Sequence, residues 1–184
     1  MKRAIALLLC LLLLNVPTAS AEEASLTNVV VTNTRDDLLL FLDVEGAFTE
    51  EIRTAVLSGV PTSFSFLVTL DQVRSMWFDR RIADIRQVHT IRYNNLKKEF
   101  AVTRSWDGGE ERVTDSFEAA MDLMAEMKGL KVAELGGLKR GERYRLAAKA
   151  ELSKVRLPLY LHYIIFFISF WDFETDWFAI DFIY

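Results

Sequence analysis

Three acidic residues near the C-terminus, Asp172, Glu174 and Asp176, have the spacing that most resembles a chemical site. On a strand they would share one face, because alternate side chains point the same way. Carboxylates this close repel one another unless a cation or a basic side chain lies between them. Pairing with arginines of a neighbouring strand is the first interpretation, and a loose Ca²⁺ site or a pair of glycosidase carboxylates are the alternatives. An EF-hand loop is excluded, since its sixth position would be Trp177 and its twelfth Ile183.

The run Trp77-Phe78-Asp79-Arg80 is the second group of interest. One interpretation is a strand end whose aromatic rings lie in the core and whose arginine faces solvent. The other is a docking surface, because Trp and Arg are enriched among the residues that dominate binding energy. Both groups together define a candidate interaction surface, which comprises Trp77, Phe78, Asp79, Arg80, Trp171, Asp172, Glu174, Asp176 and Trp177.

The sequence predicts no catalytic centre, metal or cofactor. It contains two histidines, of which His89 lies among arginines in an expected strand and His162 lies in an apolar stretch. A surface or hydrogen-bonded role fits His89, and a satisfied or interfacial role fits His162. The only cysteine is Cys10, and the chain lacks phosphate-loop, dinucleotide and Gly-x-Ser-x-Gly motifs.

The N-terminus has the pattern of an export signal. Lys2 and Arg3 precede an apolar run over residues 5–14, and Ala19-Ser20-Ala21 has the small side chains of a signal peptidase site. We therefore expect a signal peptide at 1–21 and export to the periplasm, with an uncleaved anchor as the alternative. Residues 22–184 are expected to form a single β-rich domain.

The body is expected to be mainly β (α+β), an antiparallel β-sandwich of about seven or more strands with two short amphipathic helices. Strands are expected at about 26–32, 38–44, 64–70, 85–93, 99–106, 110–113, 132–135 and 142–155.

The two expected helices carry local start and stop signals. The first is expected to begin after Thr49 as N-cap and to end at Gly59. The second is expected over Ser116 to Lys128. Asp115 and Glu118 have the spacing of a capping box, and Gly129 would end the helix.

Residues 157–184 form an aromatic, acidic C-terminal tail that contains half of the chain's aromatic residues. The alternation of Phe178, Ile180, Phe182 and Tyr184 predicts a final strand that packs on the core. The apolar stretch 157–170 is too short to span a bilayer, so contact with the membrane surface is the alternative interpretation.

Composition limits the partners. The chain is 51% hydrophobic and 12% aromatic, which excludes a disordered chain, and its formal net charge of −4 argues against a nucleic-acid partner.

Eight short motifs follow one another along the chain. They are Phe48-Thr49-x-Glu51, Ala55-Val56-x-x-Gly59-Val60-Pro61, Trp77-Phe78-Asp79-Arg80, Ile91-Arg92-Tyr93-Asn94-Asn95-Leu96, Phe100-x-Val102, Phe117-x-x-Ala120-Met121, Leu157-Pro158 and Trp171-Asp172-Phe173-Glu174-Thr175-Asp176-Trp177. In this order they resemble an exported bacterial family named domain of unknown function 4390. The apolar stretch after Leu157-Pro158 is less polar than the resemblance leads us to expect.

The resemblance implies an envelope protein of Gram-negative bacteria without an established activity, often encoded near a membrane sensor kinase. We therefore expect a non-enzymatic interaction module whose partner is another envelope protein, with such a kinase as one candidate. A membrane-associated structural protein, held by its apolar tail or an uncleaved signal, is the alternative. A hydrolase of envelope polymers that uses Asp172, Glu174 or Asp176 is a third hypothesis.

Overall fold

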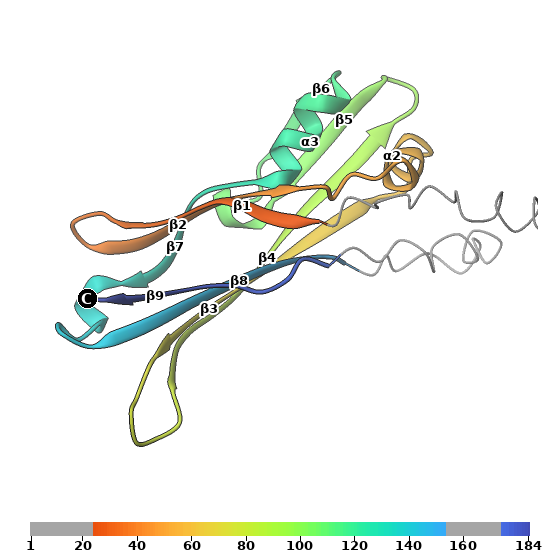
Figure 1. Cartoon of the computed structure of the whole chain (residues 1–184). Coiled ribbons are helices and arrows are strands. Elements are labelled where there is room, and N and C mark those ends of the chain that lie inside the picture. Colours follow the sequence, from red (N-terminus) through yellow and green to blue (C-terminus); the bar gives the residue numbers. More distant parts are fainter. Residues whose placement is uncertain (1–23, 154–173) are drawn as a thin grey trace, which may run out of the picture.

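A computed structural model describes residues 24–153 and 174–184, and strands dominate this part of the chain. The described strands form two antiparallel sheets, one of three strands in the order β1-β2-β7 and one of six in the order β6-β5-β4-β3-β8-β9 (Figure 1). Two helices, α2 (Glu50–Leu57) and α3 (Phe117–Ala125), accompany them. The strands are β1 (Ser25–Asn33), β2 (Asp37–Glu45), β3 (Thr62–Gln72), β4 (Arg80–Asn94), β5 (Glu99–Arg104), β6 (Glu111–Thr114), β7 (Glu126–Glu134), β8 (Arg143–Leu152) and β9 (Phe178–Ile183). The expected sandwich-like α+β fold with two short helices is confirmed.

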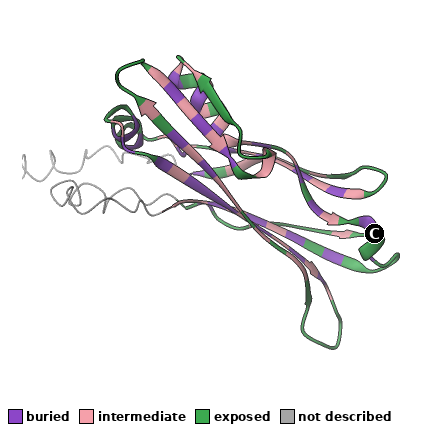
Figure 2. Ribbon diagram, turned by 180° about the vertical axis from the view of Figure 1, so that it is seen from behind, coloured by how far each residue is buried: buried purple, intermediate pink, exposed green. Residues whose placement is uncertain are grey.

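The core lies between the facing sides of the two sheets. Every second residue of the central strands is buried, as the period of a half-buried strand requires (Figure 2). The main contributors are Leu38, Leu40, Leu42 and Val44 of β2, Phe64, Phe66, Val68 and Leu70 of β3, and Tyr144, Leu146, Ala148 and Ala150 of β8. The other side of β8 carries polar residues, which leaves the outer face of the six-stranded sheet to solvent.

Helix α2 follows its local sequence signals. The Thr49 hydroxyl accepts a hydrogen bond from the backbone N–H of Ile52 at 3.5 Å, and Glu50 and Glu51 occupy the first turn. Gly59 adopts φ +83° directly after the helix, a conformation that side chains with a Cβ rarely adopt. The predicted start and end of this helix are confirmed.

Helix α3 is shorter than predicted and begins with a different cap. The N-cap is Ser116, whose Oγ accepts from the Ala119 N–H at 3.2 Å, so the capping box predicted from Asp115 is wrong by one residue. The helix ends at Ala125 because the next residues pair with β2 as strand β7.

Gly129, predicted as the helix terminator, instead lies inside β7 with φ +86°. The pairing with β2 shifts register between Leu40 and Phe41, which leaves Gly129 as the extra residue of a β-bulge. Strand β7 consequently covers more than the predicted 132–135.

Strands β3 and β4 form a long hairpin that projects beyond the rest of the six-stranded sheet (Figure 1). Their pairing runs from Thr62 opposite Ile91 to Gln72 opposite Arg80, so residues 73–79 form the loop. A register shift near Ile82 places a bulge close to the loop, and bulges increase local twist.

The C-terminal strand predicted from the alternation at residues 178–184 is confirmed as β9, which pairs antiparallel with β8 at the edge of the sheet. Several predictions fall outside the described residues: the signal peptide at 1–21, His162, Trp171, Asp172 and the apolar stretch 157–170. Within the described ranges, neither helix has the length and apolar character that crossing a membrane requires.

Candidate functional site

Three consecutive apolar side chains are exposed at the end of the β3–β4 hairpin. The exposed fractions are 90% for Met76, 79% for Trp77 and 95% for Phe78. We call residues 73–80 the tip. The interpretation of these aromatic rings as core residues is therefore wrong, because the hairpin carries them past the edge of the opposing sheet.

Two hydrogen bonds hold the backbone of the tip in place. The backbone N–H of Val73 donates to the carbonyl of Arg143 at 2.8 Å, which ties the start of the loop to β8. The carboxylate of Asp79 accepts from the backbone N–H of Arg74 at 3.1 Å and closes the loop. A loop whose backbone is held in this way loses less conformational entropy on binding.

Ion pairs brace the stem directly behind the tip. Arg81 donates to Asp71 at 2.6 Å across the two strands and to Asp84 at 3.1 Å along β4. Exposed pairs of this kind contribute at most about 1 kcal/mol each, so their main effect is to orient the stem.

Sequence reasoning missed two members of this site, Met76 and Arg74. Met76 extends the apolar surface, and the side chain of Arg74 forms no ion pair with any described residue. The sequence between β3 and β4 contains no Gly, Asn or Pro, which would have signalled a turn before Trp77.

The acidic group of the tail lies beside β8. Glu174 forms an isolated β-bridge with Glu151, and its carboxylate makes an ion pair with Lys149. Asp176 is exposed, while Trp177 is 50% exposed with the Lys149 ammonium 5.7 Å from its ring centre. Pairing with a basic residue of the neighbouring strand thus occurs at Glu174, with a lysine in place of the expected arginine.

Thr175 anchors this part of the tail. Its hydroxyl accepts from the backbone N–H of Ala150 at 3.0 Å and donates to the carbonyl of Asp176 at 3.1 Å. Residues 175–177 belong to no strand, so the strand alternation assumed for the three acids begins only at Phe178. The hydrolase hypothesis stays a prediction, since Asp172 lies outside the described residues.

The two predicted groups lie beside opposite ends of strand β3. Phe64 pairs with Leu152 near Glu174, whereas Gln72 pairs with Tyr144 and leads into the tip. The eight residue steps from Phe64 to Gln72 span about 26 Å along the strand. The tip and the acidic group therefore cannot form one contiguous site.

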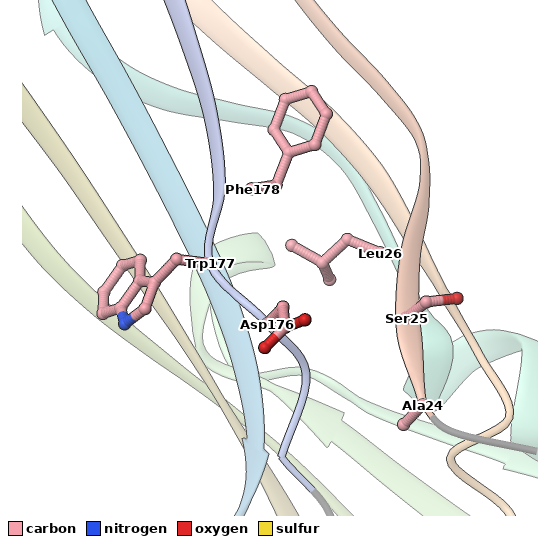
Figure 3. A pocket seen from close by; sticks show the side chains of 6 residues that line it. All are labelled: Ala24, Ser25, Leu26, Asp176, Trp177 and Phe178. Carbon is pink, nitrogen blue, oxygen red and sulfur yellow. The ribbon is translucent and has the colours of Figure 1, made fainter.

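A small hollow of about 240 Å³ separates the beginnings of edge strands β1 and β9 (Figure 3). Leu26 and Phe178 face this space, while the Trp177 ring points to the other side of β9. The hollow is also lined by Ala24, Ser25, Asp176 and Trp177. The hollow is smaller than typical ligand pockets of about 300–1,000 Å³.

A second hollow of about 350 Å³ beside β2 and α3 is lined mainly by acidic residues. One of these, Glu126, makes an ion pair with Lys128 at the same place. Among the described residues, no group of three or more His, Cys, Asp or Glu side chains is arranged to hold a metal ion.

Comparison with known proteins agrees with the resemblance seen in the motifs. The model of a family described as Domain of unknown function (DUF4390) matches residues 21–181. The chain belongs to this family. No curated protein and no solved structure matches the chain. The match includes both the tip and the acidic group of this DUF4390 member, so both are parts of the family domain.

His89 of this DUF4390 protein is fully buried, contrary to a surface role but in agreement with a hydrogen-bonded one. Its Nδ1 lies 2.9 Å from the carbonyl of Met124 and must carry the proton, since a carbonyl only accepts. Its Nε2 is buried without a hydrogen-bond partner. His89 and the buried Ile91 are two residues apart on β4, so their side chains lie on the same face of the strand. This spacing could have predicted the inward orientation of His89.

A buried ionic cluster lies close to this histidine. Arg104 is almost fully buried and donates to Asp107 at 2.5 and 2.9 Å and to Glu126 at 3.1 Å. Its guanidinium also lies 5.0 Å from the ring centre of Trp106. The cluster links the end of β5 to the start of β7, and sequence analysis gave no sign of it.

Burial lowers the pKa of His89 from 6.5 to about 4, and the positive charge of Arg104 acts in the same direction. The hydrogen bond to Met124 and the carboxylates of Asp107 and Glu126 oppose this shift. The folded state therefore binds a proton at His89 less readily than the unfolded chain does.

We predict that protonation of His89 destabilises the fold in acid. Above pH 6.5 His89 is neutral in both states and the free energy of unfolding has its full value. As the pH falls towards 4, the unfolded chain binds the proton more readily, and the free energy of unfolding decreases by up to about 3 kcal/mol. Urea unfolding of the parent protein and His89→Gln at pH 7 and pH 4 measures this effect. The parent should lose about 3 kcal/mol more than the variant, and equal losses would contradict the assignment.

Proposed function

We propose that this chain is an exported envelope protein that acts as a non-enzymatic binding module, with the tip as its binding surface. The observation that carries this proposal is the exposure of Met76, Trp77 and Phe78 side by side on a braced loop. Soluble proteins rarely leave contiguous large apolar side chains in water unless a partner covers them.

A comparison within the molecule supports the choice of the tip. Leu96 at the β4–β5 turn is 96% exposed, but it is a single apolar residue among polar neighbours. Isolated apolar residues of this kind are common on protein surfaces. The tip differs because it combines three large side chains, two of them aromatic, which are the residue types that dominate binding energy.

The proposed partner is another envelope protein. The family resemblance makes a membrane sensor kinase one candidate. A partner of this kind would cover the rings of Trp77 and Phe78 and remove them from water, which is the main source of affinity in such contacts.

We predict that a photo-crosslinking amino acid at position 78 captures one envelope protein in living cells. The additional substitution Trp77→Ala should lower the yield at least about tenfold, because a buried Trp is a typical binding hot spot. Mass spectrometry of the crosslinked product gives the yield and the identity of the partner.

The matched control places the same amino acid at position 96, which is equally exposed at the opposite end of the hairpin strand β4. This position should not capture the same protein. Equal capture from positions 78 and 96, or no capture from position 78, would contradict the proposed binding surface.

Attachment to a membrane is the second candidate function, and one observation favours it. Ser153 and Glu174, which adjoin residues 154–173, lie at the end of β3 and β8 away from the tip. Ala24, which follows residues 1–23, lines the same hollow as Asp176. Both undescribed segments are rich in apolar residues, so a membrane contact through either one would attach this end of the domain.

We predict that osmotic shock releases the protein and that its mass is that of a chain beginning at Glu22, as a cleaved signal requires. Fractionation followed by mass measurement of the intact protein checks both points. Retention with the membrane fraction after shock would favour the attached form, and retention in the cytoplasm would exclude export.

A further inference from the structure

Some charged side chains around the tip have interaction partners among the described residues, and others do not. The carboxylate of Asp71 pairs with Arg81, and that of Asp79 closes the loop by accepting from the backbone of Arg74. In contrast, the guanidinium groups of Arg74 and Arg80 form no ion pair with described residues, and both residues are exposed. Two positive charges without an ion-pair partner among the described residues therefore flank the three apolar side chains, against one carboxylate, Asp79, that likewise forms no described ion pair.

Free arginines beside exposed aromatic rings indicate the chemistry of the surface that they fit. A guanidinium binds a carboxylate through two parallel hydrogen bonds, which gives geometric specificity as well as attraction. Interfaces commonly place apolar side chains at their centre and charged pairs at their rim.

We propose that the tip binds a protein pocket that is apolar at its floor and bordered by carboxylates. Trp77 and Phe78 enter the pocket, and Arg74 and Arg80 pair with Asp or Glu residues on its rim. This inference rests on the proposed function and adds the chemistry of the partner.

An anionic lipid surface offers similar charges, but two observations favour a protein. The apolar area of three large side chains is comparable to that of a single myristoyl chain, which by itself binds membranes only marginally. The tip also lies about 26 Å or more from the end of β3 that adjoins both apolar segments. A membrane bound at that end of β3 would therefore lie about 26 Å or more from the tip.

The test uses the full-length protein with the photo-crosslinking amino acid at position 78 and compares three backgrounds in cells. The double reversal Arg74→Glu with Arg80→Glu should lower the yield about tenfold, since like charges would then face each other. The neutral pair Arg74→Gln with Arg80→Gln should give an intermediate yield. A matched reversal, Arg92→Glu with Lys97→Glu, changes the net charge equally at the far end of β4 and should change the yield less than about twofold.

The crosslinked peptide of the partner should contain Asp or Glu beside apolar residues. Equal yields in the tip reversal and the matched reversal would overturn the carboxylate rim while leaving the binding surface intact. Crosslinks to phospholipid in place of protein would overturn the protein pocket. Absence of any crosslink in the parent background would overturn the proposed function together with this inference.

Discussion

Strand β3 is hydrogen-bonded on both sides from Phe64 to Gln72, and this double pairing positions the rest of the molecule. Its inward residues are fully buried, so a slip of one residue against either neighbour would move them from the core to solvent. The register with β4 and β8 is therefore fixed by the hydrophobic effect. Because the register is fixed, the length by which β3 and β4 extend past the opposing sheet is fixed as well.

This constraint gives the domain two chemically different ends. At one end the hairpin presents apolar rings and free arginines on a loop that is closed before any partner arrives. At the other end Lys149 contacts both Glu174 and Trp177, next to the residues that adjoin the two apolar segments. A rigid antiparallel sheet between them keeps the two ends apart, so binding at one end leaves the other accessible.

Local signals allowed parts of the fold to be predicted, and non-local pairing decided the rest. The cap at Thr49 and the terminator at Gly59 act within a few residues, so the first helix was predicted correctly. Met121, Met124 and Met127 have helical spacing, yet Met127 belongs to β7 because it pairs with Leu42 of a strand far away in sequence. No local pattern distinguishes these outcomes.

The candidate site shows the same division. The residue types at Trp77 to Arg80 indicated a docking surface, but the sequence left a core role open, since aromatic residues next to a strand are usually buried. Whether they reach solvent depends on how far the opposing sheet extends. The burial of His89 was likewise hidden by the nearby polar residues Arg86, Thr90 and Arg92, although its parity with Ile91 was available.

The accessibility of position 78 in living cells tests the central claim most directly. The only cysteine is Cys10, inside the segment predicted to be removed, so Phe78→Cys and Leu96→Cys each give a mature chain with one thiol. With purified protein a maleimide should label both thiols at similar rates, because both parent side chains are more than nine-tenths exposed. In cells we predict that the thiol at position 78 is protected at least about tenfold relative to that at position 96, as a hot spot covered by a partner requires. Equal labelling of both positions in cells would contradict a partner at the tip.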